Sequence, residues 1–450
     1  MADHRYVPFL LPERPNMTTP PLFSFFSGKS RSRFNRLLLI PFLLPWSGAF
    51  AQEVFREVTL KYGAPPEEHF AELDPDTKRT FTGEHAGMTT LKRHVPKPMN
   101  LDLAGATRAE LSVEYWGGHI GTAGQRFRVN DHSWIDLPTP SGTPTEPQRY
   151  YRTLLGNNAA AIPLNQLRDG ENIFKFTAGR QVAFFNDWAF YWIYDFTTRI
   201  YYDSTTKPHP VGEVIVPQPG ATFSDLLRLE VRPSSPNGDI VRVEFIGEYD
   251  DFDWDGDGVW REWQYSTHHG VLRHHLGTVT SAPWRVKADL RWLPDQAQAI
   301  RVRARITDAT GLTYLSPPVD NIVQRREHRG VRLIKCDVVP EKWHSRAGKE
   351  SPAGSFVLTE ADMAGATFAR LVLSTWSGDV EDTSVHELRL NGERLASRFG
   401  EFHNYDHDAI EVPLDGLKVG RNELTLFSTF MGHMFEINWP GPVLLIEYKK

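Results

Sequence analysis

Regularly spaced acidic residues are the feature of this sequence whose chemistry is most readily inferred. Residues 251–262 carry aspartate at every second position from 251 to 257, glycine at 256 and glutamate at 262. This spacing, D-x-D-x-D-G-x5-E, is that of a calcium-binding loop. Calcium takes about six to eight oxygen ligands, so carboxylates around a glycine turn can enclose it. The alternative is a solvated acidic turn. The predicted ligands of one structural Ca²⁺ are Asp251, Asp253, Asp255, Asp257 and Glu262.

The segments on either side of this loop lack helical periodicity. Residues 240–246 alternate apolar and polar side chains, and residues 259–265 are rich in aromatic side chains. Both patterns predict β-strands. The loop therefore differs from an EF-hand, and Gly258 stands where an EF-hand usually has an aliphatic residue. We expect a structural ion that orders a turn between two strands, since a calcium sensor works by changing a helix angle.

Two histidine-rich segments could supply a catalytic acid or base. Residues 268–275 contain four histidines, and residues 402–408 combine histidine with aspartate. Imidazole titrates near neutral pH and also binds zinc, copper or iron, but the first segment lacks the ligand spacing of a known zinc site. The alternative for the first segment is a hairpin with exposed polar histidines. The candidate catalytic residues are His269, His274, His403, Asp406 and His407.

Tryptophans in and after the acidic loop could form a platform for a sugar ring. The candidate ligand-binding residues are Trp254, Trp260 and Trp263. Trp260 and Trp263 are three apart on one predicted strand, so they face opposite sides and at most one is expected to be exposed. Trp116 and Trp376 occupy equivalent places in apolar strands, so we expect them in the core.

Composition sets the broad class. The chain has 450 residues, of which 12% are aromatic and 24% charged, and this suits two or three globular domains. The net charge is -6, without a basic stripe or nucleic-acid motif, so nucleic acid is not an expected partner. Cys336 is the only cysteine, so an internal disulfide cannot form.

The N-terminal region has the organisation of a secretory signal. Basic residues at 31–36 precede an apolar run at 37–46 and an A-x-A site that ends at Ala51. We predict cleavage after Ala51 and a secreted or periplasmic protein, with cell-surface association as one option. The residues before the signal make it over-long, so translation could start at Met17. The alternative is a membrane anchor, but the run is shorter than the ~20 residues that a bilayer needs. No transmembrane segment is expected after signal removal.

An internal repeat organises the rest of the chain. Residues 104–116 and 364–376 begin with the same four residues and end in tryptophan. Residues 163–172 and 413–422 share the motif Pro-Leu-x-x-Leu-x-x-Gly-x-Asn, followed in both cases by an alternating strand. Each copy also contains a hairpin dipeptide, Asn130-Asp131 or Asn391-Gly392. Short alternating strands separated by turns predict antiparallel β-sandwiches.

The Pro-Leu motif with its following strand resembles galactose-binding-like jelly-roll modules of secreted bacterial glycan-handling proteins. The strands between the two copies resemble an immunoglobulin or fibronectin-III-like sandwich, with a hairpin turn at 306–311. The expected fold is all-β, with three β-sandwich domains. The predicted order is a signal segment at 1–51, a jelly roll at 53–206, an immunoglobulin-like domain with the calcium loop at 207–326, and a second jelly roll at 327–450.

These patterns favour an exported, calcium-stabilised protein that binds or presents carbohydrate or polysaccharide. One alternative is a glycan-active enzyme, a polysaccharide lyase or glycoside hydrolase, that uses the histidine and aspartate residues. Another is a non-catalytic structural or adhesion protein of the cell envelope. A deep cleft with convergent polar groups would favour the enzyme, and a shallow aromatic platform would favour the binder. The sequence leaves the glycan and the oligomeric state open.

Overall fold

The computed structural model describes residues 53–61, 72–73, 97–117, 124–139, 142, 144, 152–153, 159–178, 192–379, 384–401, 404–432 and 434–450. Within these ranges the chain is dominated by β-strands, with one α-helix, α1 (Glu360–Met363), and two 3-10 turns, η2 (Leu164–Gln166) and η3 (Leu414–Gly416). The all-β class predicted from the sequence is confirmed. No helix in these ranges has the length and apolar character to cross a bilayer. The predicted signal segment lies outside the described residues.

The first segment forms two sheets whose facing side chains make a common core. Phe174 of one sheet and Phe196 of the other are both buried, with ring centroids 5.2 Å apart. One sheet contains β1 (Glu53–Lys61), β10 (Trp192–Tyr202), β4 (Ala106–Trp116), β8 (Ala160–Ile162) and β7 (Arg152–Thr153). The other contains β3 (Lys97–Leu101), β9 (Gly170–Ala178), β5 (Arg126–Val129), β6 (Ile135–Asp136) and β2 (Glu72–Leu73).

The last segment repeats this pairing pattern. Its strands pair in the order β23-β33-β27-β30 and β26-β31-β28-β29, as β1-β10-β4-β8 and β3-β9-β5-β6 do in the first segment. One sheet contains β23 (Arg329–Lys335), β33 (Val443–Lys449), β27 (Ala366–Ser377), β30 (Tyr405–Glu411), β32 (Phe435–Ile437) and β24 (His344–Ser345). The other contains β26 (Gly354–Leu358), β31 (Gly420–Ser428), β28 (His386–Leu390), β29 (Glu393–Ser397) and β25 (Lys349–Glu350).

The asparagine that ends each Pro-Leu motif explains why the motif recurs. Asn172 and Asn422 are fully buried, and the amide nitrogen of each donates to the main-chain carbonyl four residues earlier, at 2.8 and 2.7 Å. The amide oxygen of each accepts a hydrogen bond from the hairpin asparagine, Asn130 or Asn391. A buried amide must be hydrogen-bonded. Each motif asparagine therefore joins the 3-10 turn to a neighbouring hairpin with φ near +50° at its asparagine.

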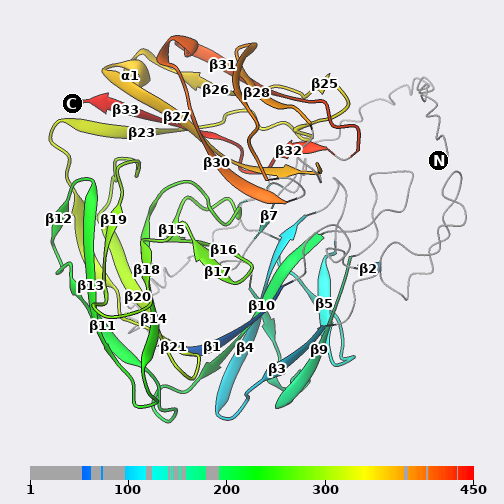
Figure 1. Ribbon diagram of the computed structural model, residues 1–450, viewed down its shortest axis with the longest axis vertical. Coiled ribbons are helices and arrows are strands. Elements are labelled where there is room, and N and C mark those ends of the chain that lie inside the picture. The colour runs from blue at the N-terminus through cyan, green and yellow to red at the C-terminus, as the bar shows by residue number, and fades with distance from the viewer. Residues whose placement is uncertain are drawn as a thin grey trace, which may run out of the picture. The chain divides into compact units, whose positions relative to one another are not determined.

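The middle segment continues the sheet of the first. Strand β1 pairs with β10 on one side and with β21 on the other, so strands from both segments share one hydrogen-bonded sheet (Figure 1). On the middle side this sheet contains β21 (Leu312–Leu315), β20 (Ile300–Asp308), β22 (Val319–Gln324), β12 (Thr222–Phe223), β14 (Ile240–Asp250), β15 (Arg261–Gln264) and β18 (Gly277–Val279). The remaining middle strands are β11 (Val211–Val216), β13 (Leu226–Ser234) and β19 (Arg285–Asp289), and the hairpin β16 (Ser266–His268) with β17 (Val271–Arg273). The division into three domains remains a prediction.

Trp116 and Trp376 are buried, as the sequence predicts, but they lie outside the apolar clusters between the sheets. Their rings stack on each other with centroids 5.7 Å apart. The indole nitrogen of Trp116 donates to Glu436, and that of Trp376 donates to the Tyr194 hydroxyl at 2.6 Å. Burial raises the pKa of Glu436 to about 8. The equivalent tryptophans of the two copies thus form a contact between the first and last segments.

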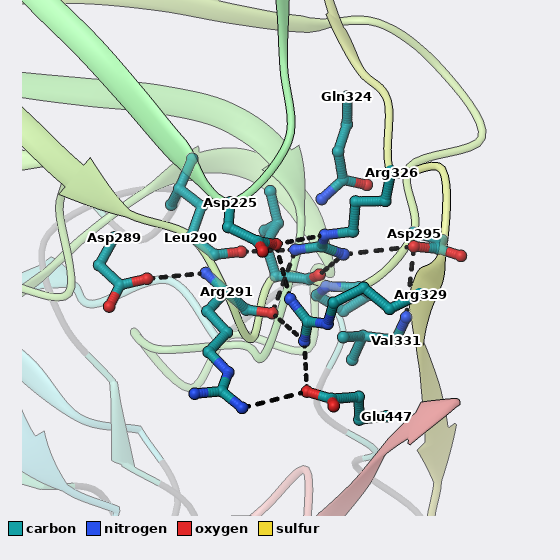
Figure 2. A network of polar contacts seen from close by, with 12 residues as sticks. Asp225, Asp289, Leu290, Arg291, Asp295, Gln324, Arg326, Arg329, Val331 and Glu447 are labelled. Atoms are coloured by element: carbon teal, nitrogen blue, oxygen red, sulfur yellow. Dashed lines mark hydrogen bonds and ion pairs between the residues drawn. The ribbon is translucent and has the colours of Figure 1, made fainter. Parts of the chain in front are cut away.

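A buried arginine fixes the connection between the middle and last segments. The Arg326 guanidinium donates to Asp225 and Asp295 and to three main-chain carbonyls, those of residues 290, 291 and 293. Arg329 follows it and bonds Asp225 at 2.6 Å and Glu447 of β33 at 2.6 Å. Figure 2 shows both guanidinium groups converging on Asp225. This network joins the end of the middle segment to the sheet of the last.

Candidate functional site

The acidic loop joins two antiparallel strands, as predicted. Strands β14 and β15 pair from Gly247 with Gln264 to Asp250 with Arg261. Asp253, Asp255 and Asp257 of the loop and Glu262 of β15 place one carboxylate oxygen each within 4.8 Å of the others. The three aspartates are buried. Four of the five predicted ligands are therefore brought together, and their hard oxygen donors fit a calcium ion.

Asp251, the fifth predicted ligand, is engaged elsewhere. Its carboxylate accepts a hydrogen bond from the Trp254 indole nitrogen at 3.0 Å. Its own main-chain N–H donates to the carbonyl of Trp260 and extends the hairpin ladder by one step. Burial raises the pKa of Asp251 to about 6, although the bond from Trp254 favours the ionised form. Asp251 therefore positions the tryptophan rather than joining the four-carboxylate cluster.

Two glycines give the loop its backbone path. Gly256 has φ +76° and Gly258 has φ +86°, both in the left-handed region that favours glycine. The N–H groups of these glycines donate to Asp253 at 2.8 and 2.5 Å. A Cβ on Gly258 would collide with the main chain of Gly142, which itself donates to the Asp257 carbonyl at 2.7 Å. This close approach explains why glycine replaces the aliphatic residue of an EF-hand.

Burial and mutual repulsion disfavour the ionised carboxylates of the acidic cluster. Burial, followed by the Asp257 charge, raises the pKa of Asp253 to about 7. Burial and the charges of Glu262 and its neighbours raise the pKa of Asp255 still further above its ordinary value. Carboxylates this close are all ionised only when a cation compensates them, and otherwise some of them hold protons. A divalent ion would supply that compensation.

The three candidate platform tryptophans do not share one surface. Trp254 stacks on His274 with centroids 3.9 Å apart and contacts His407 edge-on at 5.4 Å. Trp260 packs with the apolar residues of β23, β27 and β33, and the Lys335 ammonium lies 3.8 Å from its ring centroid. Trp263 belongs to a different cluster, where the guanidinium of Arg303 lies over its ring. Trp260 and Trp263 thus face different neighbours, as their spacing predicts.

The candidate histidines divide among separate environments. The predicted hairpin at 268–275 is present, but His268 is buried, with Nδ1 2.8 Å from Glu114 Oε1. The adjacent His269 lies near the same carboxylate.

His274 and His407 contact each other beside Trp254, with centroids 4.6 Å apart. Asp406 caps the main-chain N–H of His407 on β30. His403 lies outside the described residues.

Glu114 and Asp195 are the acidic residues that sequence reasoning missed. Both are almost fully buried, and together with His269 they place ligand atoms within 4.8 Å of one another. The signal in the sequence was an acidic residue inside an otherwise apolar strand, in residues 111–116 and 193–196. Charged residues are seldom buried unless paired, so these two acids were detectable as unusual, but their pairing was not.

A groove of about 480 Å³ lies between the acidic loop and the last segment. The loop side contributes the Trp260 ring with Asp250 and Asp251, and the other side contributes Arg332, Lys335 and Tyr448. The Arg332 guanidinium lies 3.4 Å from the Tyr448 ring centroid. We call this feature the Trp260 groove. Aromatic and charged side chains around one cavity are typical of a small-ligand site.

Comparison with known families and with curated proteins gives no match. Among solved structures, a β-porphyranase of glycoside hydrolase family 86 from Bacteroides plebeius is 12% identical, with a TM-score of 0.21, over 54% of this chain and 37% of that one. The fibronectin(III)-like modules of Clostridium thermocellum CbhA are 12% identical, with a TM-score of 0.17, over 51% and 92%. Carbohydrate-binding modules of the β-sandwich superfamily are 7% identical, with a TM-score of 0.16, over 55% and 99%. These similarities assign no activity to the chain.

Proposed function

We propose that the chain is an exported, calcium-stabilised β protein that binds carbohydrate, and that the Trp260 groove is its binding surface. The observation that carries the proposal is the composition of the groove, in which the Trp260 ring adjoins Asp250, Arg332 and Lys335. Sugar rings present apolar C–H faces that pack on aromatic rings, and their hydroxyls bond to neighbouring charged groups. The volume of the groove, about 480 Å³, lies in the range of small-ligand sites.

The candidate calcium site and the groove share one hairpin. The hairpin that holds the four-carboxylate cluster also supplies Asp250, Asp251 and Trp260 to the groove wall. An ion bound between Asp253, Asp255, Asp257 and Glu262 would hold that wall in place. Calcium removal should therefore weaken glycan binding as well as stability.

Trp260→Ala is expected to weaken binding to the recognised polysaccharide about tenfold, because an aromatic contact of about 1 kcal/mol or more is lost. Affinity electrophoresis against a broad panel of polysaccharides measures this change. Trp263→Ala is the matched control, because Trp263 does not line the groove, and it should migrate as the unmodified protein does. Absence of retention on every polysaccharide would remove the basis of the proposal.

Calcium is expected to raise the melting temperature relative to a chelator. A ligand that binds only the native state at about 100 times its Kd adds about 2.7 kcal/mol of stability. Asp255→Asn should abolish this response, whereas Asp251→Asn should keep it, because Asp251 bonds Trp254 instead of joining the cluster. Differential scanning calorimetry with calcium and with chelator measures both. Equal melting temperatures under the two conditions would contradict the structural ion.

A further inference from the structure

We propose that Glu114, Asp195 and His269 form a site for a divalent transition-metal ion, distinct from the acidic loop and from the Trp260 groove. The ligand atoms of the three residues lie within 4.8 Å of one another. The carboxylates come from β4 and β10, and the imidazole comes from the turn between β16 and β17. Mixed carboxylate and imidazole donors suit zinc, manganese or iron better than calcium, which prefers oxygen alone.

A register shift between β4 and β10 brings the two carboxylates together. Ile193 pairs with Tyr115, and the next pair is Asp195 with Glu114, so Tyr194 is an extra residue in β10. Without this bulge, Asp195 would point to the other face. Like charges directly opposite each other on paired strands destabilise a sheet. Both carboxylates are also at most 3% exposed, and a cation bound between them would interact with both charges in a buried setting.

His269 lies in a tight two-residue turn, which fixes its place relative to the two strands. His269 has φ +49° and Gly270 has φ +73°, which makes a two-residue hairpin turn of the type that prefers Asn-Gly. Histidine, like asparagine and aspartate, is enriched among the residues other than glycine that adopt positive φ. A Cβ on Gly270 would lie 2.9 Å from the Thr59 side chain, so the turn rests closely on β1.

Neighbouring groups orient Glu114. Its carboxylate is held by His268 Nδ1 at 2.8 Å and by the main-chain N–H of His269 at 3.3 Å. Such partners of a ligand fix its orientation.

The separation between His269 and Asp195 suits two ligands of one ion. His269 Nδ1 lies 3.7 Å from Asp195 Oδ2, which is longer than a hydrogen bond. Metal–ligand bonds of about 2.0–2.2 Å to each atom would span such a separation. The strand and turn positions therefore bring three donors of the right kinds around one point.

Cobalt(II) is the probe for this site, because its visible d–d absorption reports coordination by protein ligands directly. Tag-free full-length protein is titrated with Co²⁺ in a large excess of Ca²⁺, which occupies the oxygen-only loop. We expect one equivalent to bind with new visible bands, and Zn²⁺ to displace it. His269→Gln should weaken Co²⁺ binding at least about tenfold, whereas His328→Gln, at a histidine that is 94% exposed, should not change it.

Asp195→Asn provides a second variant, with far-UV circular dichroism as the measure of folding. It should weaken Co²⁺ binding to a similar extent while leaving the calcium response of the loop intact. Unmodified protein that gives no visible bands with Co²⁺ would overturn the site. So would folded His269→Gln or Asp195→Asn protein that binds Co²⁺ as tightly as the unmodified chain.

Discussion

Arg326→Ala is expected to lower the free energy of unfolding by about 3–5 kcal/mol. The Arg326 side chain is 1% exposed and makes five hydrogen bonds, two to carboxylates and three to main-chain carbonyls. Its removal leaves a cavity and several buried acceptors without a donor, and each unpaired buried acceptor costs about 1–3 kcal/mol. Urea denaturation followed by intrinsic tryptophan fluorescence measures the difference.

Arg325→Ala is the matched control, because the preceding arginine is exposed. Surface substitutions of this kind usually change stability by about 0.5 kcal/mol or less. Arg326→Lys separates charge from geometry, because an ammonium cannot reproduce the planar fork that reaches Asp225, Asp295 and the carbonyls together. Equal stability of the Arg325→Ala and Arg326→Ala proteins would show that the network shown in Figure 2 contributes little to folding.

Local chemistry made much of the fold predictable. The hairpin at 306–311 follows from Asp308, whose carboxylate accepts the N–H and hydroxyl of Thr310. The two-residue turn at Asn391-Gly392 has positive φ at both residues, as its sequence demands. Residues 227–231 alternate apolar and charged side chains, and in β13 the apolar ones are buried. In each case the residues that decide the structure are close together in the sequence.

The burial of a strand's two faces depends on contacts with distant segments. The alternation in 240–246 predicted a strand, which is present as β14, and its residues 243–247 are buried on both faces. One face packs into the sandwich core through Phe245, and the other contributes Ile246 to a cluster with Leu272 of the histidine hairpin. Burial of the second face depends on which element covers it, and periodicity within the strand carries no information about that element.

The candidate site was also predictable only where its residues are close together in the sequence. The spacing within residues 251–262 was sufficient to identify the four clustered carboxylates. It could not show that Asp251 bonds Trp254 instead, because the ladder of β14 and β15 runs one residue past Asp250. The cluster of Glu114, Asp195 and His269 depends on a one-residue bulge in a pairing of strands far apart in the chain. A change of register by one residue would reverse the faces, so sequence spacing alone could not predict it.

A buried ion network joins the first and middle segments at β1. Glu57 of β1 pairs with Arg199 of β10 and with Arg305 of β20. Burial by itself disfavours the ionised carboxyl, but the charges and hydrogen bonds of Arg305 and Arg199 outweigh burial and lower the pKa of Glu57 to about 2. Arg199 also pairs with Glu110 at 2.8 Å. The network therefore spans strands of the sheet that both segments share.

Glu57→Gln is expected to lower the free energy of unfolding at pH 7 by about 3 kcal/mol, because two buried guanidinium groups lose a shared counter-ion. The folded-state pKa of about 2 lies below the ordinary 4.5. The stabilisation by Glu57 is therefore complete above about pH 4.5 and is lost as the pH falls from there toward 2. Urea denaturation at pH 7, 4.5 and 3 should show that the difference in unfolding free energy between the two proteins shrinks as the pH falls.

Glu53→Gln on the same strand removes an exposed ion pair with Arg108 and should cost about 1 kcal/mol or less. A gap that stays constant with pH would mean that shape, and not charge, accounts for the loss.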